Sequence, residues 1–236
     1  MRCVRDMRLA ALTGVDGIGA DGADMTADAL FRNFIERNAY AERIAISLAR
    51  RGFTPNILSL LALLTAALSG VFFAASRSSA KFNLTLLIAG IFVALNAFFD
   101  MFDGILARAT HNTTRKGDFL EHVFDRYSDV FIIIGIIMGG HVRWDIGAVA
   151  MIGVLLSSYV GVQAQAVGLH RVYGGVLGRA DRLLIIIGAT IFNAFHSEPI
   201  ISPFGELTPL GLIVVVIAFL SHLTAIQRFI YAWRML

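Results

Sequence analysis

The sequence has 236 residues, of which 57% are hydrophobic and only 16% are charged. About a quarter of the residues in soluble domains are charged, so this composition excludes a soluble globular protein and indicates an integral membrane protein. The net charge of +3 arises from 20 basic and 17 acidic residues that form no basic stripe, which argues against a nucleic-acid partner. Cys3 is the only cysteine, so intrachain disulfides and thiolate metal sites are excluded.

The N-terminal part of the chain divides into an irregular and a regular segment. Residues 1–24 are rich in glycine and show no periodicity, so we predict a disordered extension there and a membrane domain over residues 25–236. Within residues 27–49, apolar and charged positions alternate with a roughly helical period. This pattern predicts an amphipathic helix lying on the membrane surface, and the alternative is an amphipathic helix packed on protein.

Six apolar segments follow this helix. Residues 57–75 contain no charged side chain and are long enough to cross about 30 Å of hydrocarbon. Thr54 can cap this first span, and Pro55 can occupy its first turn. The predicted fold is an all-α integral membrane protein with an interfacial helix and six transmembrane helices. We expect these spans at residues 55–75, 84–108, 117–140, 146–166, 180–196 and 207–231.

The basic residues of the connections predict the orientation in the membrane. If the N-terminus is cytoplasmic, most Arg and Lys residues of the short connections lie inside, and only Arg77, Lys81 and Arg143 lie outside. We therefore expect a multi-pass protein of the plasma membrane with both termini in the cytoplasm. The acidic end of the second span faces the same side.

Two pairs of acidic residues stand out beside apolar sequence. Residues three or four apart share one face of a helix, so Asp100 pairs with Asp103, and Glu121 pairs with Asp125 on the next helix. Four carboxylates can thus converge from neighbouring helices, and such a cluster beside lipid requires cations to neutralise it. Hard oxygen ligands of this kind suit Mg²⁺, Mn²⁺ or Ca²⁺.

These acids belong to a longer pattern, D-x2-D-G-x2-A-R-x8-G-x3-E-x3-D, which begins at Asp100 and ends at Asp125. The pattern resembles the signature of the CDP-alcohol phosphotransferases, with Glu121 where that family has Asp. The entry into the first span, Thr54-Pro55-Asn56, is also similar, and the resemblance covers about Ala27 to the C-terminus. The family consists of six-span membrane enzymes that join a CDP-activated lipid to an alcohol and release CMP.

The resemblance implies roles for particular residues. Asp100, Asp103, Glu121 and Asp125 would hold two divalent cations, Mg²⁺ or Mn²⁺, and Ca²⁺ would inhibit if it bound there. Asp125 would also remove the proton of the acceptor hydroxyl. The CDP-lipid would be bound by Pro55, Asn56, Asp100, Gly104, Ala107, Arg108 and Gly117.

Some of these residues have simpler explanations. The small side chains of Gly104, Ala107 and Gly117 leave room for a nucleotide, but they also suit tight helix packing or a helix start. Arg108 could reflect only the topological charge bias. We expect Asp118 to be a helix N-terminal acid and Asp129 to contact Arg126, and neither is included among the ligands.

The connection between the fourth and fifth spans carries the predicted acceptor site. Arg171, Arg179 and Arg182 lie there, and the planar fork of an arginine matches a phosphate; topological charge bias is the alternative. Pieces such as Ser158-Tyr159 and Gly178–Arg182 resemble archaeal members, several of them archaetidylinositol phosphate synthases. The resemblance thus implies CDP-archaeol or CDP-diacylglycerol as donor and a polyol phosphate, inositol phosphate, as acceptor, with glycerol phosphate as the alternative. It also implies a homodimer.

Two other classes of function fit the sequence less well. An ion or proton transporter could use intramembrane acids, but transport sites tend to lie near the midplane, and these acids lie at the end of a span. A membrane anchor or scaffold would leave the carboxylates unexplained.

Overall fold

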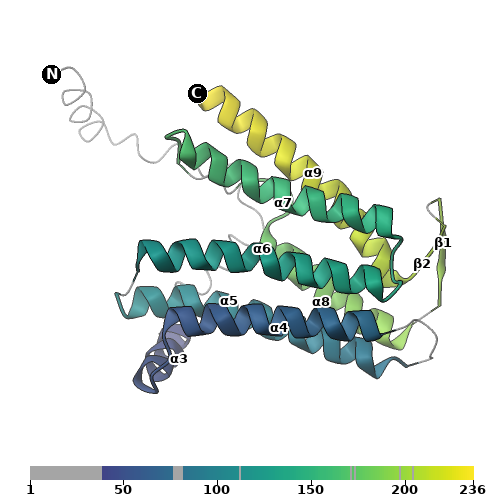
Figure 1. Cartoon of the computed structure of the whole chain (residues 1–236), viewed down its shortest axis with the longest axis horizontal. Coiled ribbons are helices and arrows are strands. Elements are labelled where there is room, and N and C mark those ends of the chain that lie inside the picture. The colour runs from purple at the N-terminus through teal and green to yellow at the C-terminus, as the bar shows by residue number, and fades with distance from the viewer. Residues whose placement is uncertain are drawn as a thin grey trace.

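The computed structural model describes residues 39–76, 82–111, 113–170, 172, 174–196, 198–203 and 205–236 (Figure 1). The predicted extension over residues 1–24 lies outside these residues, as do residues 27–38 of the predicted interfacial helix. The elements, in chain order, are α3 (Ala39–Arg50), α4 (Pro55–Ala75), α5 (Leu84–Ala109), α6 (Arg115–Met138), α7 (Trp144–Ala166), α8 (Arg179–Phe195), β1 (Ile200–Ser202), β2 (Gly205–Leu207) and α9 (Pro209–Met235).

Side-chain caps determine where several helices begin. Thr54 accepts a hydrogen bond from the Ile57 amide, and Pro55 opens α4, as the sequence predicts. Thr114 accepts a hydrogen bond of 3.0 Å from the Gly117 amide. The third helix therefore begins at Arg115, two residues before its predicted start.

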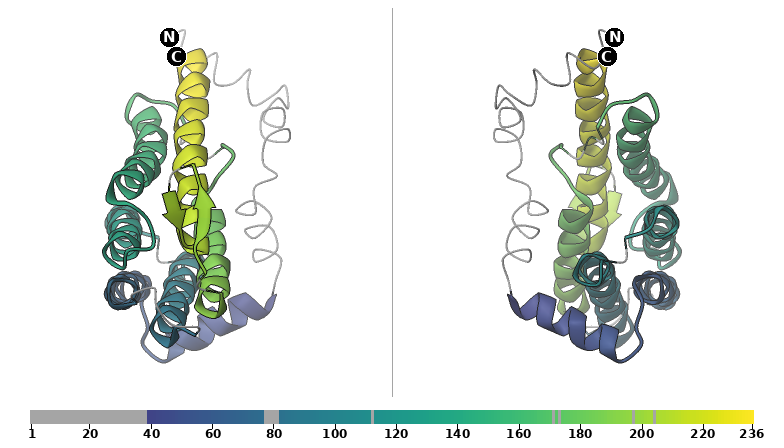
Figure 2. Two further views of the ribbon diagram at one scale, coloured as in Figure 1. Left: turned by 90° about the vertical axis from the view of Figure 1, so that its right-hand side faces the viewer. Right: turned by 90° about the vertical axis from the view of Figure 1, so that its left-hand side faces the viewer.

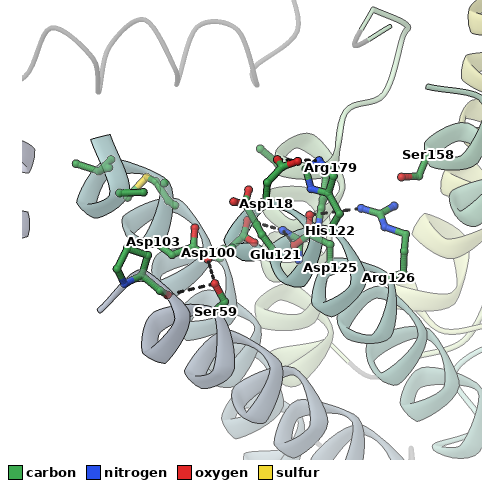
Figure 3. Close-up of a pocket in the computed structure, with 18 of the residues that line it drawn as sticks. Ser59, Asp100, Asp103, Asp118, Glu121, His122, Asp125, Arg126, Ser158 and Arg179 are labelled. Carbon is green, nitrogen blue, oxygen red and sulfur yellow. Dashed lines mark hydrogen bonds and ion pairs between the residues drawn. The ribbon is translucent and has the colours of Figure 1, made fainter. Parts of the chain in front are cut away.

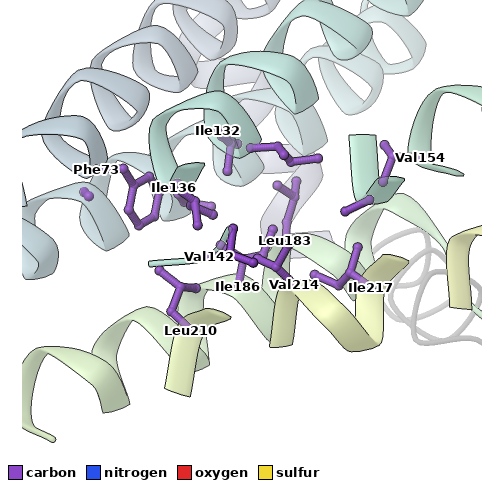
Figure 4. Packing of buried hydrophobic residues seen from close by; sticks show 14 of the residues in the cluster. Phe73, Ile132, Ile136, Val142, Val154, Leu183, Ile186, Leu210, Val214 and Ile217 are labelled. Atoms are coloured by element: carbon purple, nitrogen blue, oxygen red, sulfur yellow. The ribbon is translucent and has the colours of Figure 1, made fainter. Parts of the chain in front are cut away.

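The helices pack in two groups. In the first, α4 lies against both α5 and α6; in the second, α7 lies against α9. Helix α8 contacts α5 and α9, and α6 contacts α7, so these helices join the groups. The core between them holds buried side chains of several helices, including Phe73, Ile132, Ile136, Val154, Leu183, Leu210 and Val214 (Figure 4).

The contact between α4 and α6 depends on two glycines. A Cβ atom on Gly135 would collide with the backbone of Gly70, and one on Gly70 would collide with the carbonyl of Phe131. Small residues allow helix backbones in a membrane to approach in this way. The position of α6 relative to α4 is therefore fixed by backbone contact.

Helix α3 lies across the other helices at one end of the bundle (Figure 2). Ala45 is fully buried and packs with Leu58, Phe102, Ile105 and Leu106, while Ile44 remains 48% exposed. The part of the predicted segment that the structure describes, Ala39–Arg50, is helical, with one face buried and one exposed. Part of its apolar face packs on protein, which was the alternative to a purely interfacial helix.

Four helices of the described residues are long and apolar enough to cross a membrane, namely α4, α5, α7 and α9. Helices α6 and α8 do not meet this criterion, because α6 begins with a charged half and α8 has 17 residues with charges in its first turn. Large apolar side chains, such as Val71 at 64% exposed and Phe219 at 70%, lie on the outside of the bundle. The chain is therefore a multi-pass membrane protein.

The all-α prediction missed one small sheet. Strands β1 and β2 form an antiparallel hairpin in which Ile200 pairs with Leu207 and Ser202 pairs with Gly205. Each strand has only three residues, which is too short for an alternating pattern to appear in the sequence.

At the end of the bundle opposite α3, a buried histidine joins three helices. His141, in the connection between α6 and α7, lies with its Nε2 atom 2.9 Å from Ser76 Oγ at the end of α4. Its carbonyl accepts a hydrogen bond of 3.1 Å from Thr208 Oγ1, the cap of α9. Burial lowers the pKa of His141 below its ordinary value, so the neutral imidazole is favoured in the folded protein.

This lowered pKa predicts a loss of stability in acid. The contribution of His141 is complete above its unfolded pKa of about 6.5 and is lost as the pH falls, by at most about 1.4 kcal/mol per pH unit. The His141→Asn variant should therefore show a smaller drop in thermal midpoint between about pH 7.5 and about pH 5.5. Tryptophan fluorescence of detergent-solubilised protein would measure the thermal midpoint of both proteins at each pH. An equal drop in wild type and variant would show that His141 is not the group responsible.

Candidate active site

The last turns of α5 carry the first pair of acids. Asp103 is 2% exposed, and its Oδ2 atom accepts a hydrogen bond of 2.7 Å from Ser59 Oγ on α4. The other oxygen, Oδ1, is buried without a hydrogen-bond donor among the described residues. Asp100 lies three residues earlier on the same face, with 26% of its side chain exposed. A buried carboxylate oxygen without a partner is costly in free energy, and a bound cation would remove that cost.

The first half of α6 carries the second pair. Glu121 and Asp125 line the same cavity as Asp100 and Asp103, and one nitrogen of Arg179 contacts both Asp100 and Asp125. The structure thus brings all four predicted carboxylates to one cavity, as the helical spacing predicts. Within the described parts of the chain, however, no three of these acids or of the histidines surround one point closely enough to share an ion.

Arg179, the first residue of α8, lies between the two pairs (Figure 3). Its Nη1 atom donates to Asp100 Oδ2 and lies 3.0 Å from Asp125 Oδ1. Its Nε atom is 3.5 Å from Asp129 Oδ1, and only 13% of the side chain is exposed. The guanidinium therefore joins α5 to α6, two helices that have few other contacts with each other.

Asp129 is a buried anion shared by three arginines. Its carboxylate, 5% exposed, lies 3.1 Å from Arg182, 3.3 Å from Arg126 and 3.5 Å from Arg179. The predicted contact with Arg126 is confirmed. The contacts of Arg182 and Arg179 with the same acid extend this ion pair into a network that links α6 to α8.

The cavity has a volume of about 580 Å³, within the range of small-molecule sites. Every residue predicted to bind the CDP-lipid lines it, as do Arg179 and Arg182, whereas Arg171 lies outside the described residues. The lining combines acids of α5 and α6 with arginines of α8 and α9, and Arg108 and Arg126 also belong to it. Arg179 contacts Asp100 and Asp125 directly.

The glycines of the cavity wall favour open space over tight helix packing. A Cβ atom on Gly104 would meet only the Arg108 side chain, at an ordinary contact distance of 3.5 Å. One on Gly117 would lie 3.2 Å from the hydroxyl of Thr114, the cap of the same helix, and 3.4 Å from the Asn56 side chain of α4. Substitution at either position would thus take room from the cavity without disturbing a neighbouring helix backbone.

A family model for CDP-alcohol phosphatidyltransferases matches residues 53–235. The chain belongs to this family. The archaetidylinositol phosphate synthase of Pyrococcus horikoshii is 36% identical over 187 residues, covering 79% of this chain and 87% of that protein. The enzyme of the same name from Methanothermobacter thermautotrophicus is 32% identical over 169 residues, covering 72% and 82%.

Solved structures support the same placement. The Mycobacterium tuberculosis phosphatidylinositol phosphate synthase with CDP-DAG bound superposes with a TM-score of 0.66 at 25% identity, covering 82% of this chain and 93% of that one. Its complex with manganese and citrate gives a TM-score of 0.67 at 26% identity, covering 82% and 88%. The resemblance seen in the sequence is confirmed, and this CDP-alcohol phosphatidyltransferase is a membrane enzyme that transfers a substituted phosphate group.

Several residues of this CDP-alcohol phosphatidyltransferase site were not singled out in the sequence. Ser59 lies one helical turn after Pro55 and Asn56, so its place on the cavity face could have been found from spacing. Arg228 of α9 also lines the cavity and donates to the carbonyls of Gly174 and Ser157, at 2.8 and 2.6 Å. No local pattern predicts that contact, because its partners lie far away in the chain.

The network around Asp129 predicts a large stability effect. Asp129→Asn removes the charge shared by three buried or half-buried guanidiniums and should cost about 3–5 kcal/mol of unfolding free energy. The exposed pair of Arg143 and Asp145 supplies a matched control, and Asp145→Asn should leave stability unchanged within error. Denaturant unfolding in detergent would measure both variants, and similar values for the two would contradict the structural role of Asp129.

Proposed function

We propose that this protein transfers a lipid phosphate group from a CDP-lipid, CDP-archaeol or CDP-diacylglycerol, to a hydroxyl of inositol phosphate and releases CMP. The observation that carries the proposal is one cavity lined both by acids of α5 and α6 and by arginines of α8 and α9. Such a cavity offers carboxylates to cations and guanidinium groups to an anionic acceptor. The names of the archaeal relatives support inositol phosphate as the acceptor.

The donor set fits hard divalent cations. Asp100, Asp103, Glu121 and Asp125 offer only oxygen, and the buried Oδ1 atom of Asp103 needs a positive partner. We propose that these residues hold two ions, Mg²⁺ or Mn²⁺, with Glu121 reaching one methylene further than Asp. When bound, two such ions would neutralise the pyrophosphate and stabilise the charge that develops on departing CMP.

The remaining steps use side chains of the chain itself. Gly104, Ala107 and Gly117 leave space for the nucleotide beside Asn56. The acceptor hydroxyl attacks the phosphorus attached to the lipid, the bond from that phosphorus to the CMP oxygen breaks, and the hydroxyl proton passes to Asp125. Arg179 lies on the same side of the cavity as Asp125 and is suited to hold the phosphate of the acceptor.

The position of the site supports the proposed orientation. The cavity is built from the C-terminal end of α5 and the N-terminal ends of α4, α6 and α8. We propose that this end faces the cytoplasm of the plasma membrane, that α6 and α8 complete six spans, and that the enzyme forms a homodimer. An ion transporter would not require arginines beside the acids in one cavity. Glycerol phosphate is the alternative acceptor.

A panel of acceptors tests the proposal. With Mg²⁺ or Mn²⁺ and a CDP-lipid, purified enzyme should release CMP fastest with inositol phosphate and only weakly with free inositol, because the arginines select a phosphate. Faster release with glycerol phosphate would establish the alternative acceptor. Ion flux in vesicles without CMP release from any mixture would contradict the enzyme.

Replacement of the proposed base gives a second test. Asp125→Asn should lower the rate of CMP release by at least about 100-fold while the CDP-lipid still binds, because proton removal contributes about that much. Asp118→Asn is the control on the same helix, since Asp118 has 71% of its side chain exposed. An Asp125→Asn enzyme of normal activity would remove Asp125 as the base.

A further inference from the structure

Arg179 occupies carboxylate oxygens that the proposed function assigns to cations. Its Nη1 atom contacts Asp100 Oδ2 and Asp125 Oδ1 together, although these acids come from different helices. Its Nη2 atom is buried and has no hydrogen-bond partner among the described residues. The Nη1 side of the guanidinium is therefore bound to acids, while the N–H groups of Nη2 make no hydrogen bond among the described residues.

Nη1 lies against Asp100 Oδ2 and Asp125 Oδ1, which is the place that a divalent ion bridging these two oxygens would take. Both groups are cations and repel each other at contact distance. An ion that bridges these two oxygens must therefore displace Nη1. Conversely, a group that draws Arg179 away leaves both carboxylates available to the ion.

Arg179 keeps a second anchor when it leaves the pair. Its Nε atom lies 3.5 Å from Asp129, which is held in place by Arg182 and Arg126 at 3.1 and 3.3 Å. The start of α8 is fixed as well, since the Gly178 amide donates a hydrogen bond of 2.8 Å to Asp181. The end of the side chain can thus change partners while its base stays in position.

We propose that Arg179 competes with divalent cations for Asp100 and Asp125, and that the acceptor phosphate relieves this competition by taking the guanidinium. The inference rests on the proposed function of the same site. Because coupling between two ligands is reciprocal, the acceptor phosphate strengthens ion binding by the same factor by which the ion strengthens acceptor binding. Arg179, by binding the acceptor phosphate, then makes assembly of the ion site depend on the acceptor.

The test measures ion binding without turnover. Free Mn²⁺ is followed by electron paramagnetic resonance in a titration of wild-type enzyme in nanodiscs, without CDP-lipid, in the presence and absence of inositol phosphate. A titration without protein corrects for Mn²⁺ held by inositol phosphate itself. We expect inositol phosphate to lower the Kd for Mn²⁺ by roughly tenfold, within the usual range of coupling between sites.

Variants separate competition from general charge. Arg179→Gln should bind Mn²⁺ roughly tenfold more tightly than wild type without acceptor, and should lose the response to inositol phosphate. Arg126→Gln is the matched control, because Arg126 lies 3.6 Å from Asp125 and no contact joins it to Asp100. It should keep the response to inositol phosphate and gain less affinity.

Each result has a definite meaning. Unchanged or weaker Mn²⁺ binding by Arg179→Gln, or an equal gain in Arg126→Gln, overturns the competition. The wild-type titration needs no variant, so absence of coupling there also overturns it if Arg179→Gln fails to fold. If CMP release with inositol phosphate persists in these cases, the proposed function stands alone; if wild-type enzyme neither binds Mn²⁺ nor releases CMP, both proposals fail.

Discussion

The cost of placing charged groups beside lipid governs the arrangement of this protein. Carboxylates of two helices meet at one end of an apolar bundle, and they are stable there only because guanidinium groups lie against them. The negative charge of these acids is only partly compensated, and the buried Oδ1 atom of Asp103 has no hydrogen-bond donor among the described residues. The guanidinium groups thus neutralise enough of the negative charge for the protein to fold. The charge that remains allows the site to bind further cations.

The apolar scaffold determines where these charges meet. Contact between Gly70 and Gly135 fixes α6 on α4, and α4 in turn provides Ser59 to Asp103 and Asn56 to the cavity wall. Phe102, Ile105 and Leu106 alternate with the acids along α5 and hold the other side of that helix against Leu58 and Ala45. The acids therefore lie on the face of α5 that lines the cavity, beside Ser59 of α4.

Local patterns were enough to predict much of this structure. Thr54 and Pro55 predict the start of α4, and the spacing of Asp100 from Asp103 and of Glu121 from Asp125 predicts the convergence of the acids. The position of Arg179 between these pairs could not be predicted, because it depends on how α8 packs against α5. The hairpin was missed because short strands carry no periodic signal, and α6 was extended too far at its C-terminal end, where Gly139 and Gly140 end the helix.

The division of the bundle into two packed groups has a mechanical consequence. The carboxylates belong to α5 and α6, in the group formed around α4, whereas Arg179, Arg182 and Arg228 belong to α8 and α9. Backbone contact at Gly70 and Gly135 makes the first group stiff. Because α8 packs against both α5 and α9, any shift of α8 along α5 would change the contacts of Arg179 with Asp100 and Asp125, so the packing of α8 and the charge balance of the site are linked.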